Sequence, residues 1–410
     1  MKTFFSRSAI TVALLGANQV LAGGLWLNEY GDFAGARASA GAAAGTDEAS
    51  TIIHNPASAG RLEGSQLFVS AGAFIPQVEF DIEESNQFIG DEDGGQAGEI
   101  APGASLAYIY DTGSDKWGLG VSLGGLSGAG LDYNDDWVGR YQVTDVFLLL
   151  MGLGVSLSYQ VTDKFAIGVK PLFYYSTLDM DIRIPTSLAT GRNDAKAELD
   201  GDDTGWGVAA GFTYDFSSRT RVGISWTSEF DIKYDGDLKI KGDRPVSAQA
   251  NSDTELDMAQ TIRAGLHHQL NDRWGVDFSV GWDDWSALDS VFVSVDTGDG
   301  DGAALKKNWK DTYHYAAGLQ YKLNDKWDLT SGIAYDTNPI DADDRTADLP
   351  VDRQVRYNAG ARYQYSEALS LGGYVNYTDL GNARITGNFW TGEYSSNEVY
   401  SFSVFLNWTL

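Results

Sequence analysis

The chain has no cysteine and no long apolar run. The absence of cysteine excludes disulfide bonds, which suits an exported protein that does not rely on them. Beyond the N-terminus, the longest apolar run extends from Val146 to Val155, and its ten residues include two glycines. A helix needs about 20 apolar residues to cross a bilayer. If this chain lies in a membrane, it must therefore cross as a closed β-barrel, which also satisfies its backbone hydrogen bonds.

Basic residues are scarce as well. Lys and Arg number 29 against 57 Asp and Glu, and the net charge is −28. Nucleic-acid binding needs a basic face, so we expect no nucleic-acid partner. In an outer-membrane protein the acidic excess would lie mainly in loops, where divalent cations could bridge it to lipid headgroups. Solubility in a salty medium is the other interpretation.

Histidine is rare, which limits the catalytic chemistry open to the chain. The four histidines are His54, His267, His268 and His314. An outer-membrane lipase or protease needs a nucleophile or a water molecule that a histidine activates and a third group supports. None of the four forms a recognisable constellation with Ser or Asp, so we predict no enzymatic activity.

One Asp/Gly-rich stretch, with Asp296, Asp299 and Asp301, raises the question of a metal site. The twelfth position of a calcium-binding EF-hand loop is a bidentate Glu, whereas here that position holds Lys307. We therefore predict no dedicated metal site and no cofactor.

Residues 1–22 have the features of a secretory signal peptide. Lys2 and Arg7 accompany a mostly apolar stretch from Ala9 to Leu15, and Val20-Leu21-Ala22 places small residues at a cleavage site. We predict that the chain is exported and that these residues are removed.

The last eleven residues alternate between apolar and polar side chains, as a β-strand with two different faces does. One face carries Tyr400, Phe402, Val404, Leu406, Trp408 and Leu410, and the other carries Ser401, Ser403, Phe405, Asn407 and Thr409. In an exported chain that repeats this pattern, the apolar face contacts lipid and the polar face lines a lumen. We predict an all-β fold, an antiparallel transmembrane β-barrel in the outer membrane of a Gram-negative bacterium.

A polar turn followed by a basic residue and an aromatic residue recurs along the chain and indicates tight hairpins. It occurs at Ser114-Asp115-Lys116-Trp117, Thr162-Asp163-Lys164-Phe165, Asn271-Asp272-Arg273-Trp274 and Asn324-Asp325-Lys326-Trp327, with weaker versions at 217–219 and 366–367. The aromatic residue would lie at the lipid–water boundary. Long polar loops separate these turns, and short turns at one end with long loops at the other are typical of outer-membrane barrels.

Counting strands between these marks gives fourteen. We place them near 65–80, 101–110, 116–125, 145–160, 164–182, 203–216, 220–240, 256–270, 274–295, 310–323, 326–336, 353–365, 368–386 and 397–410. Because the number is even, both ends of the chain fall on the side of the short turns, the periplasm.

The alternation also places basic side chains inside the barrel of this acidic protein. Those predicted to point inward include Lys170, Arg221, Arg263, Arg356 and Arg362. Two interpretations stay open. The basic groups pair with inward carboxylates such as Asp328 and hold the wall together, or they form a path that attracts an anionic headgroup.

Residues 23–64 have a different composition from the rest. From Gly31 to Gly60 they include ten alanines and five glycines and show no alternation. Thr46, Asp47 and Glu48 resemble a helix start, and Asn55-Pro56 would end that helix. Small residues allow close packing, so we predict a compact plug in the lumen of a barrel formed by residues 65–410.

Several short motifs stand out along the chain. The N-terminal ones are Leu27-Asn28-Glu29-Tyr30, Gly35-Ala36-Arg37-Ala38, Ala42-Ala43-Ala44, Asp47-Glu48-Ala49-Ser50-Thr51 and Asn55-Pro56-Ala57. Later ones are Trp309-Lys310-Asp311-Thr312-Tyr313, Gly332-Ile333-Ala334-Tyr335-Asp336 with Pro339, and Asp352-Arg353. These motifs resemble the FadL/OmpP1/TodX family of outer-membrane transporters for long-chain fatty acids and other hydrophobic molecules, and Asn55-Pro56-Ala57 is similar to the family's hatch motif. The resemblance covers essentially the whole mature chain. A departure is Leu410, since members usually end in Phe.

The resemblance implies a fourteen-stranded barrel plugged by a small N-terminal hatch domain. It also implies a route, in which ligand lands among extracellular loops, enters a mostly apolar pocket and leaves sideways through a gap at a kinked third strand. Here that strand continues through Gly124, Gly125 and Gly128, and glycines inside a strand mark bulges or bends. The other interpretation is an ordinary flexible transition from strand to loop.

The resemblance implies a ligand contact for Lys310, because this residue lies in the matching Trp-Lys-Asp-x-Tyr motif. Its side chain would bind a carboxylate headgroup. Arg183 is a second candidate by position alone, with a solvated charge at a strand end as the alternative. Apolar residues of the second long loop are predicted to be exposed and to form a landing groove, with packing on neighbouring loops as the alternative. They are Leu131, Tyr133, Trp137 and Tyr141.

We therefore predict a monomeric outer-membrane protein that takes up long-chain fatty acids or similar hydrophobic molecules by passive lateral diffusion. Lys310 favours fatty acids over the alternative substrates, neutral aromatic or aliphatic hydrocarbons. The plug-like N-terminus argues against a general porin. The expected partners are the ligand, outer-membrane lipid and lipopolysaccharide, and the barrel-assembly machinery.

Overall fold

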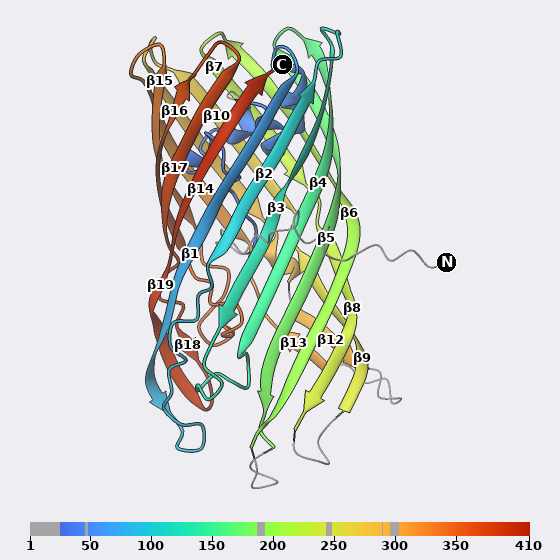
Figure 1. Cartoon of the computed structure of the whole chain (residues 1–410), viewed down its shortest axis with the longest axis vertical. Helices are drawn as coiled ribbons and strands as arrows, with labels where there is room; N and C mark the ends of the chain where they lie inside the picture. The colour runs from blue at the N-terminus through green and yellow to red at the C-terminus, as the bar shows by residue number, and fades with distance from the viewer. Residues whose placement is uncertain (1–24, 46–47, 187–192, 243–247, 289, 296–302) are drawn as a thin grey trace, which may run out of the picture.

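The protein forms a closed antiparallel β-barrel (Figure 1). The computed structural model describes residues 25–45, 48–186, 193–242, 248–288, 290–295 and 303–410. The predicted signal peptide and the Asp296, Asp299 and Asp301 stretch lie outside the described residues. Among those that are described, no helix is long and apolar enough to cross a bilayer.

The described residues contain nineteen strand segments in one sheet. In chain order they are β1 (Gln66–Ser85), β2 (Ala101–Tyr110), β3 (Trp117–Asp132), β4 (Asp145–Thr162), β5 (Phe165–Ile184), β6 (Ala195–Ser217), β7 (Thr220–Thr227), β8 (Phe230–Lys241), β9 (Ala248–Met258), β10 (Thr261–Gln269), β11 (Trp274–Asp283), β12 (Ser290–Val295), β13 (Ala303–Lys306), β14 (Thr312–Lys322), β15 (Trp327–Asp336), β16 (Gln354–Gln364), β17 (Leu369–Asp379), β18 (Ile385–Thr386) and β19 (Trp390–Thr409). A short 3₁₀ turn, η5 (Trp285–Ala287), lies between β11 and β12.

Within the described chain these segments make fourteen barrel strands, because several are consecutive pieces of one strand. β7 and β8 both pair with β6, so they are two pieces of one strand. β10 pairs with β7 and β9 pairs with β8, so β9 and β10 form the next strand. In the same way β11 and β12 form one strand and β13 and β14 form another, while the two-residue β18 lies against β19. β1 pairs with both β2 and β19, which closes the barrel. The predicted number of strands is confirmed.

The predicted boundaries are wrong mainly at the strand ends away from the short turns. β3 extends to Asp132 instead of 125, β6 begins at Ala195 instead of 203, and β19 begins at Trp390 instead of 397. The prediction followed apolar residues that face outward, and these extensions have few of them. The outward residues are charged or polar in β6 and β19, and two of the three in β3 are glycines. We call the two ends of the barrel the short-turn end and the long-loop end.

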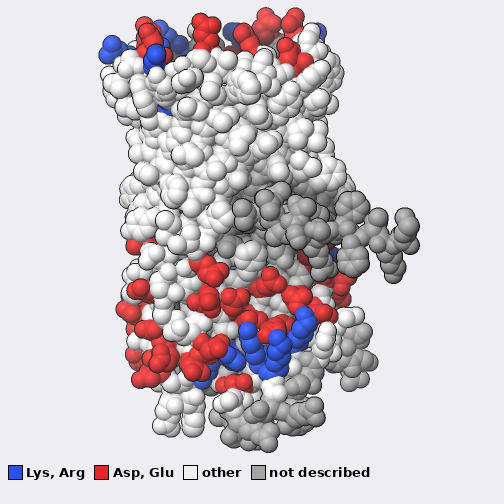
Figure 2. All heavy atoms as spheres, viewed as in Figure 1, with Lys and Arg blue, Asp and Glu red and all other residues white. Residues whose placement is uncertain are grey.

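The outer surface is divided into bands along the barrel axis. On the face drawn in Figure 2, a broad band with few charged residues separates charged side chains at the short-turn end from a charged belt near the long loops. The predicted alternation in β19 is confirmed, because Tyr400, Phe402 and Val404 are exposed on the outer wall while Ser401 and Ser403 are buried inside. The apolar band has the position and composition that a lipid-facing wall requires.

The N-terminal segment lies inside the barrel, at the end that carries the short turns and the C-terminus (Figure 1). Its elements are η2 (Gly35–Arg37), η3 (Ala42–Ala44), α1 (Thr51–His54) and η4 (Pro56–Gly60). Two of the three residues of the predicted helix start, Thr46 and Asp47, lie outside the described residues. The third, Glu48, lies before α1, which begins at Thr51, and its side chain accepts a hydrogen bond from Phe33 N. The predicted end at Asn55 is confirmed, since its backbone is extended.

Inward-facing glycines let this segment approach the wall closely. A Cβ atom on Gly223 of β7 would collide with the carbonyl oxygen of Ala43, and one on Gly332 of β15 would collide with that of Arg37. Both obstacles are backbone atoms, so they cannot turn aside as a side chain does. The wall glycines are therefore complementary to the N-terminal segment.

Candidate functional site

Asn55 anchors the N-terminal segment to two barrel strands. Its Nδ2 donates to the carbonyl oxygens of Ala43 at 2.7 Å and Phe212 at 3.0 Å, and to that of Ile224 at 3.4 Å. Its Oδ1 accepts a hydrogen bond from Ala57 N at 3.0 Å. One side chain thus satisfies groups of the segment, of β6 and of β7 together.

The other two residues of the Asn-Pro-Ala motif continue this contact. Pro56 opens η4, where its missing N–H is not needed and its fixed φ suits the turn. Both Pro56 and Ala57 are buried, and a Cβ atom on Gly168 of β5 would collide with Ala57 N. The motif therefore occupies a position against the wall that leaves no room for larger residues.

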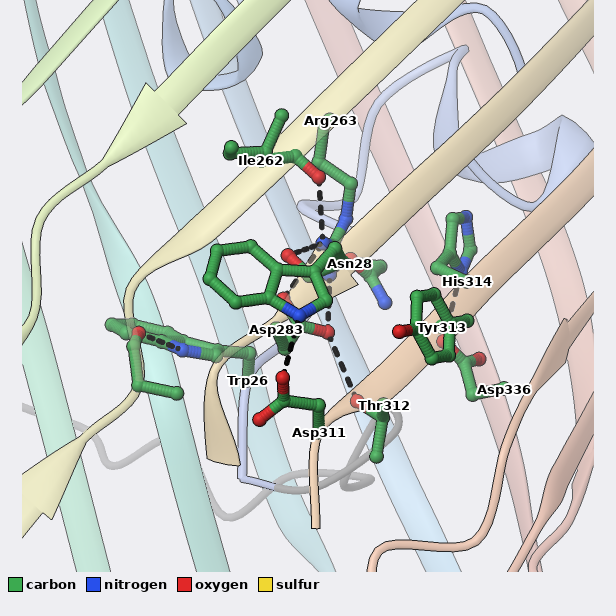
Figure 3. Close-up of polar contacts among 12 residues, drawn as sticks. Trp26, Asn28, Ile262, Arg263, Asp283, Asp311, Thr312, Tyr313, His314 and Asp336 are labelled. Carbon is green, nitrogen blue, oxygen red and sulfur yellow. Dashed lines mark hydrogen bonds and ion pairs between the residues drawn. The ribbon is translucent and has the colours of Figure 1, made fainter. Parts of the chain in front are cut away.

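A buried network of charged side chains joins the same segment to β14, β15 and β16. Arg356 Nη2 lies 2.5 Å from Asp336 Oδ2, and Arg356 Nε lies 3.3 Å from Glu29 Oε1. His314 Nδ1 lies 2.8 Å from the second oxygen of Asp336, as Figure 3 shows. Because these groups are buried, removing one of them leaves the charge of its partner uncompensated.

Most inward basic residues have a carboxylate partner. In Figure 3, Arg263 reaches both oxygens of Asp283, at 2.7 and 3.0 Å. The same pairing holds for Arg37 with Asp277 (3.4 Å), Arg221 with Asp215 (2.6 Å) and Arg362 with Asp328 (3.1 Å). The predicted pairing with inward carboxylates is confirmed for Arg221, Arg263 and Arg362, while their role in holding the wall together stays a prediction. Lys170 differs, because its Nζ donates to the carbonyl oxygens of Ile52 and Ile53.

Two acidic residues of the N-terminal segment have shifted pKa values. Burial would raise the pKa of the Asp32 carboxyl, but His54, whose Nε2 lies 2.8 Å away, and the N–H of Gly35 lower it below its ordinary value. Burial raises the pKa of Glu29, although Arg356 opposes this shift. The two carboxyls differ because Asp32 has direct hydrogen-bond donors, which favour its charged form.

A cavity lies between the N-terminal segment and the wall, where residues of β3, β4, β5, β7, β10, β11 and β14 line it. Its volume is ≈ 100 Å³. Apolar lining residues include Trp26, Leu123, Leu126 and Leu172, and polar ones include Ser122, Lys170, Arg263, His54 and His314. The mixed lining suits a ligand with one polar and one apolar end.

Next to this cavity the lumen contains an apolar cluster. It includes Leu25, Trp26, Leu126, Leu148, Leu150, Leu172, Tyr174, Phe230, Ile232, Tyr234, Leu256, Met258, Trp285 and Trp309. Its rings are in contact, with the Phe230 centroid 5.3 Å from Tyr174 and 5.5 Å from Trp26. Because Trp26, Leu126 and Leu172 belong to both the cluster and the cavity lining, the two adjoin.

β3 has a bulge where the sequence predicted a bend. An extra residue, Leu126, interrupts the register with β4 between Gly125 and Ser127, and its carbonyl oxygen accepts a hydrogen bond from Leu27 N at 3.0 Å. The β2–β3 ladder ends at the pair Ser105 and Gly124, and the next bridge joins residues 98 and 131. Between these bridges, no described residue of 100–104 pairs with β3. The predicted bulge is confirmed next to Gly124 and Gly125, whereas Gly128 lies in regular register with Leu149, and the role of the three glycines as a gate stays a prediction.

A second, smaller cavity lies behind this interruption in the ladder, and Gly103, Ala104 and Gly125 form part of its wall. Tyr30 lines both cavities. The carbonyl oxygen of Tyr30 accepts hydrogen bonds from Ser105 Oγ at 2.6 Å and from Ser70 Oγ at 3.1 Å, so the N-terminal segment is attached directly behind the gap.

Lys310 is absent from the lining of either cavity. Its side chain is 56% exposed and pairs with Asp341, while its backbone N–H donates to Pro339 O at 2.7 Å. The neighbouring Trp309 is buried in the apolar cluster, 5.3 Å from Trp285. The motif therefore brings its tryptophan into the lumen, and headgroup binding by Lys310 stays a prediction.

Arg183 lies near the end of β5, on the long-loop side. Its Nη2 is 2.5 Å from Asp135 Oδ2, and its backbone N–H donates to Arg140 O. It is thus paired within the protein rather than solvated alone, and a role in ligand binding is untested.

The predicted exposure of the second long loop is wrong. Leu131 belongs to β3, and Leu131, Tyr133 and Trp137 are buried in a second cluster that includes Phe80 and Trp390. Tyr133 and Trp137 stack with their ring centroids 4.0 Å apart. The alternative, packing on neighbouring loops, is what these residues do, because a stacked aromatic cluster buries more area than separate exposed rings.

Tyr133 and Tyr141 make different contacts. The Tyr133 hydroxyl is 2.8 Å from that of Tyr394, and burial raises its pKa well above the ordinary value. The Tyr141 hydroxyl donates to Asp194 Oδ2 at 2.6 Å and lies apart from the stacked rings. The four predicted groove residues are therefore not brought together as one surface.

The sequence prediction missed the residues of the apolar cluster, including Trp26, Phe230 and Trp285. A signal for them exists in β8, where Phe230, Ile232 and Tyr234 alternate with charged residues. The alternation is regular but has its apolar side inward. In the part of the chain that the structure describes, no group of three or more His, Asp or Glu is placed to hold a metal ion.

Comparison with known proteins gives a match over nearly the whole chain. Residues 13–399 match the family described as outer membrane protein transport protein (OMPP1/FadL/TodX). The long-chain fatty acid transport protein of Escherichia coli O6:H1 is 25% identical over 410 residues, covering 90% of each chain. Outer membrane protein P1 of Haemophilus influenzae is 26% identical over 428 residues, covering 94% of this chain and 91% of the relative.

Two solved structures share the fold. A Pseudomonas aeruginosa FadL homologue has a TM-score of 0.87 at 19% identity, covering 94% of this chain and 99% of the other. The toluene transporter TodX of Pseudomonas putida has a TM-score of 0.71 at 18% identity, with the same coverage. At these identities the likeness concerns the barrel architecture alone.

Proposed function

The chain belongs to the OMPP1/FadL/TodX family of outer membrane transport proteins, and on that premise we propose that it takes up long-chain fatty acids or similar hydrophobic molecules. The observation that carries the proposal is the apolar cluster inside the lumen, next to a cavity with both apolar and polar lining residues. A general porin would instead need a solvated polar lumen throughout its length. The activities named for the E. coli relative and for the toluene transporter support outer-membrane uptake of hydrophobic compounds.

In this proposal residues 23–64 act as a hatch that blocks the lumen. The described part of this segment is held by Asn55, by the ion pair of Glu29 with Arg356 and by contacts with wall glycines. A segment fixed at so many points prevents steady flow of ions through the barrel. The short-turn end, which holds the hatch, faces the periplasm.

The ligand leaves through the wall, between β2 and β3. Support comes from the bulge at Leu126 and from the missing ladder pairs between residues 100–104 and β3. A ligand that moves sideways into the lipid does not have to cross the polar network around Arg356. No energy-coupling segment is needed, because the ligand moves down its gradient.

Neutral hydrocarbons are the alternative substrates. Lys310, which the sequence connects with a carboxylate, is largely exposed and paired with Asp341. An apolar ligand without a headgroup needs only the apolar cluster, and the toluene transporter shares the fold. Outer-membrane lipid, lipopolysaccharide and the barrel-assembly machinery remain the proposed partners of a monomer.

The absence of native cysteine makes a direct test of the lateral route possible. Gly125→Cys places a single thiol at the interrupted ladder, and thiol reagents of increasing size then block the space stepwise. Uptake of radiolabelled oleate and of toluene is measured in cells or vesicles before and after labelling. We expect uptake to fall at least ~10-fold with the largest reagent, while ligand binding to the purified protein persists.

The matched control is Ser114→Cys, which places the same reagent on an exposed short turn away from the gap. Labelling there should leave uptake unchanged. Transport that continues at the control rate after labelling of position 125 contradicts the lateral route. Wild-type protein that neither binds nor transports oleate or toluene contradicts the proposed function itself.

A further inference from the structure

Lys170 stands apart from the other basic residues that line the larger of the two cavities described above. His54, Arg263 and His314 each have a carboxylate oxygen within hydrogen-bond distance, and Figure 3 shows two of these pairs. Lys170 Nζ donates instead to two backbone carbonyl oxygens, of Ile52 at 3.2 Å and Ile53 at 2.7 Å. Among the described residues, no carboxylate forms an ion pair with it.

This lysine is nevertheless buried, with only 5% of its surface exposed. An ammonium group has three N–H donors, and the two carbonyl groups occupy two of them. Carbonyl dipoles do not neutralise a charge, and a buried charge without a counter-ion is unfavourable. The site is therefore complementary to an anion that brings its own charge into the cavity.

Ser122 lies next to Lys170 on the cavity wall. Both line the cavity, and a Cβ atom on Gly154 of β4 would lie 2.7 Å from Lys170 Cδ and 3.0 Å from Ser122 Oγ. Because Gly154 has no side chain, the aliphatic part of the Lys170 side chain and the Ser122 hydroxyl can lie next to each other. Within the described part of the chain, the Ser122 hydroxyl has no hydrogen-bond partner, so it is available to a ligand.

An apolar surface continues from this polar point. Leu172 follows Lys170 on the same face of β5, because alternate residues of a strand point the same way. Leu172, Leu126 and Trp26 line the cavity and also belong to the apolar cluster. A ligand with its anionic end at Lys170 would place an aliphatic chain along these residues.

We propose that Lys170 and Ser122 bind the carboxylate of a long-chain fatty acid inside the cavity and so favour anionic amphiphiles over neutral hydrocarbons. The inference rests on the proposed function and names the substrate class. The two basic residues suggested by the sequence are already paired, Lys310 with Asp341 and Arg183 with Asp135. Lys170 is the basic residue whose counter-ion the ligand itself supplies.

The test compares a charged ligand with its neutral isostere. Dissociation constants of oleate and methyl oleate are measured for the full-length protein in detergent at pH 8, as wild type, Lys170→Met and Lys170→Arg. A charge-assisted hydrogen bond changes affinity by about 10- to 100-fold, so Lys170→Met should weaken oleate binding by that factor. Methyl oleate affinity should change by less than about threefold, and Lys170→Arg should retain most of the preference for oleate.

The matched control is Lys322→Met, which removes one exposed positive charge that pairs with Asp325. It should leave both ligands unaffected. If Lys170 only supports α1 through the carbonyl groups, then Lys170→Met weakens both ligands equally, and the proposal is overturned. It is overturned too if oleate binding survives Lys170→Met and is lost in Lys310→Met.

Failure of the proposed function has a separate signature. Wild-type protein that binds none of oleate, methyl oleate and toluene contradicts both the function and this inference, whereas binding of toluene alone contradicts this inference only. Wild-type protein that binds the two ligands with equal affinity leaves hydrophobic uptake in place and removes Lys170 from headgroup recognition. The same conclusion follows if Ser122→Ala and Lys170→Met together leave the oleate preference intact.

Discussion

The barrel wall reverses its polarity between the short-turn half and the long-loop half. In β16, on the short-turn side, Tyr357 is exposed to the outside while Arg356 and Asn358 are buried in the lumen. In β8, on the long-loop side, Lys233 is exposed to the outside while Ile232 and Tyr234 are buried. Both strands alternate between polar and apolar residues, but the apolar residues point outward in β16 and inward in β8. The charged belt in Figure 2 marks where the outside changes.

This difference follows from what each half contacts. The outside of the short-turn half faces lipid, so its charges are inside and paired with one another or with the N-terminal segment. The outside of the long-loop half faces water, and its interior offers apolar surface to a ligand. Lys170 lies where the two interiors meet, beside the hatch and next to the apolar cluster. Charge recognition and apolar binding can therefore act on one ligand.

The largest expected effect tests the paired interior of the short-turn half. Arg356→Met leaves Asp336 and Glu29 buried without their partner. Breaking a buried ion pair from one side costs about 3–5 kcal/mol. We expect the free energy of unfolding, measured by denaturant titration in detergent, to fall by that amount. Ion conductance across planar bilayers should rise, because the hatch loses a contact.

The control for this variant is Arg353→Met, in the loop just before β16. Arg353 pairs with Asp379 at 2.8 Å, but both side chains are more than one-third exposed. A solvent-screened pair contributes about 0–1 kcal/mol, so this variant should be nearly as stable as the wild type. Equal losses in the two variants would remove the distinction between buried and exposed charges.

A smaller loss is expected when the anchor of the hatch is removed. Asn55→Ala leaves the carbonyl oxygens of Ala43 and Phe212 without a donor in a buried place. We expect a destabilisation of about 2 kcal/mol and faster proteolysis of residues 25–64, measured by limited trypsin digestion. Asn55→Asp keeps the acceptor for Ala57 N but lacks the donor, so it should not restore protease resistance. Full resistance in Asn55→Ala would contradict the anchoring role.

The same reversal explains how much of the molecule the sequence could predict. Strand number and the lipid-facing residues of β19 follow from alternation, because lipid and lumen impose a simple rule on the membrane part. This rule assumes that the apolar side chains of a strand point outward. It therefore misplaced the start of β6, where Ala195 and Ala197 are buried while the intervening Lys196 is in an ion pair. It also failed for Trp137, whose burial depends on rings from distant loops.

The candidate site was predicted less well, for a similar reason. Asn55 and the glycines of β3 could be predicted, because each has a local sequence signal. For Asn55 the signal is a turn motif, and for the glycines it is their weak pairing in a strand. The cavity depends on contacts between the N-terminal segment and strands more than a hundred residues away, which no local pattern contains. Lys310, which the sequence motif suggested, faces solvent, whereas Lys170, which belongs to no motif, lines the cavity.

A modest effect is expected from the apolar interior of the long-loop half. Phe230→Leu keeps an apolar side chain but removes the ring that contacts Tyr174 and Trp26. Such aromatic pairs contribute about 0.5–1.5 kcal/mol beyond their buried area, so we expect a destabilisation of about 1 kcal/mol. Affinity for both oleate and methyl oleate should fall together, in contrast to Lys170→Met. Selective loss of oleate alone would contradict an apolar role for this residue.

The smallest effect is expected on the outside of the long-loop half. Lys233 pairs with Glu255 at 2.9 Å, but the side chains are 67% and 47% exposed. Water and salt screen such a pair, so Lys233→Met should leave the free energy of unfolding unchanged within the error of the measurement. The measurement is a denaturant titration at low and high salt. A clear loss of stability that salt abolishes would mean that the charged belt is an organised network, and the contrast between paired inner charges and independent outer ones would no longer hold.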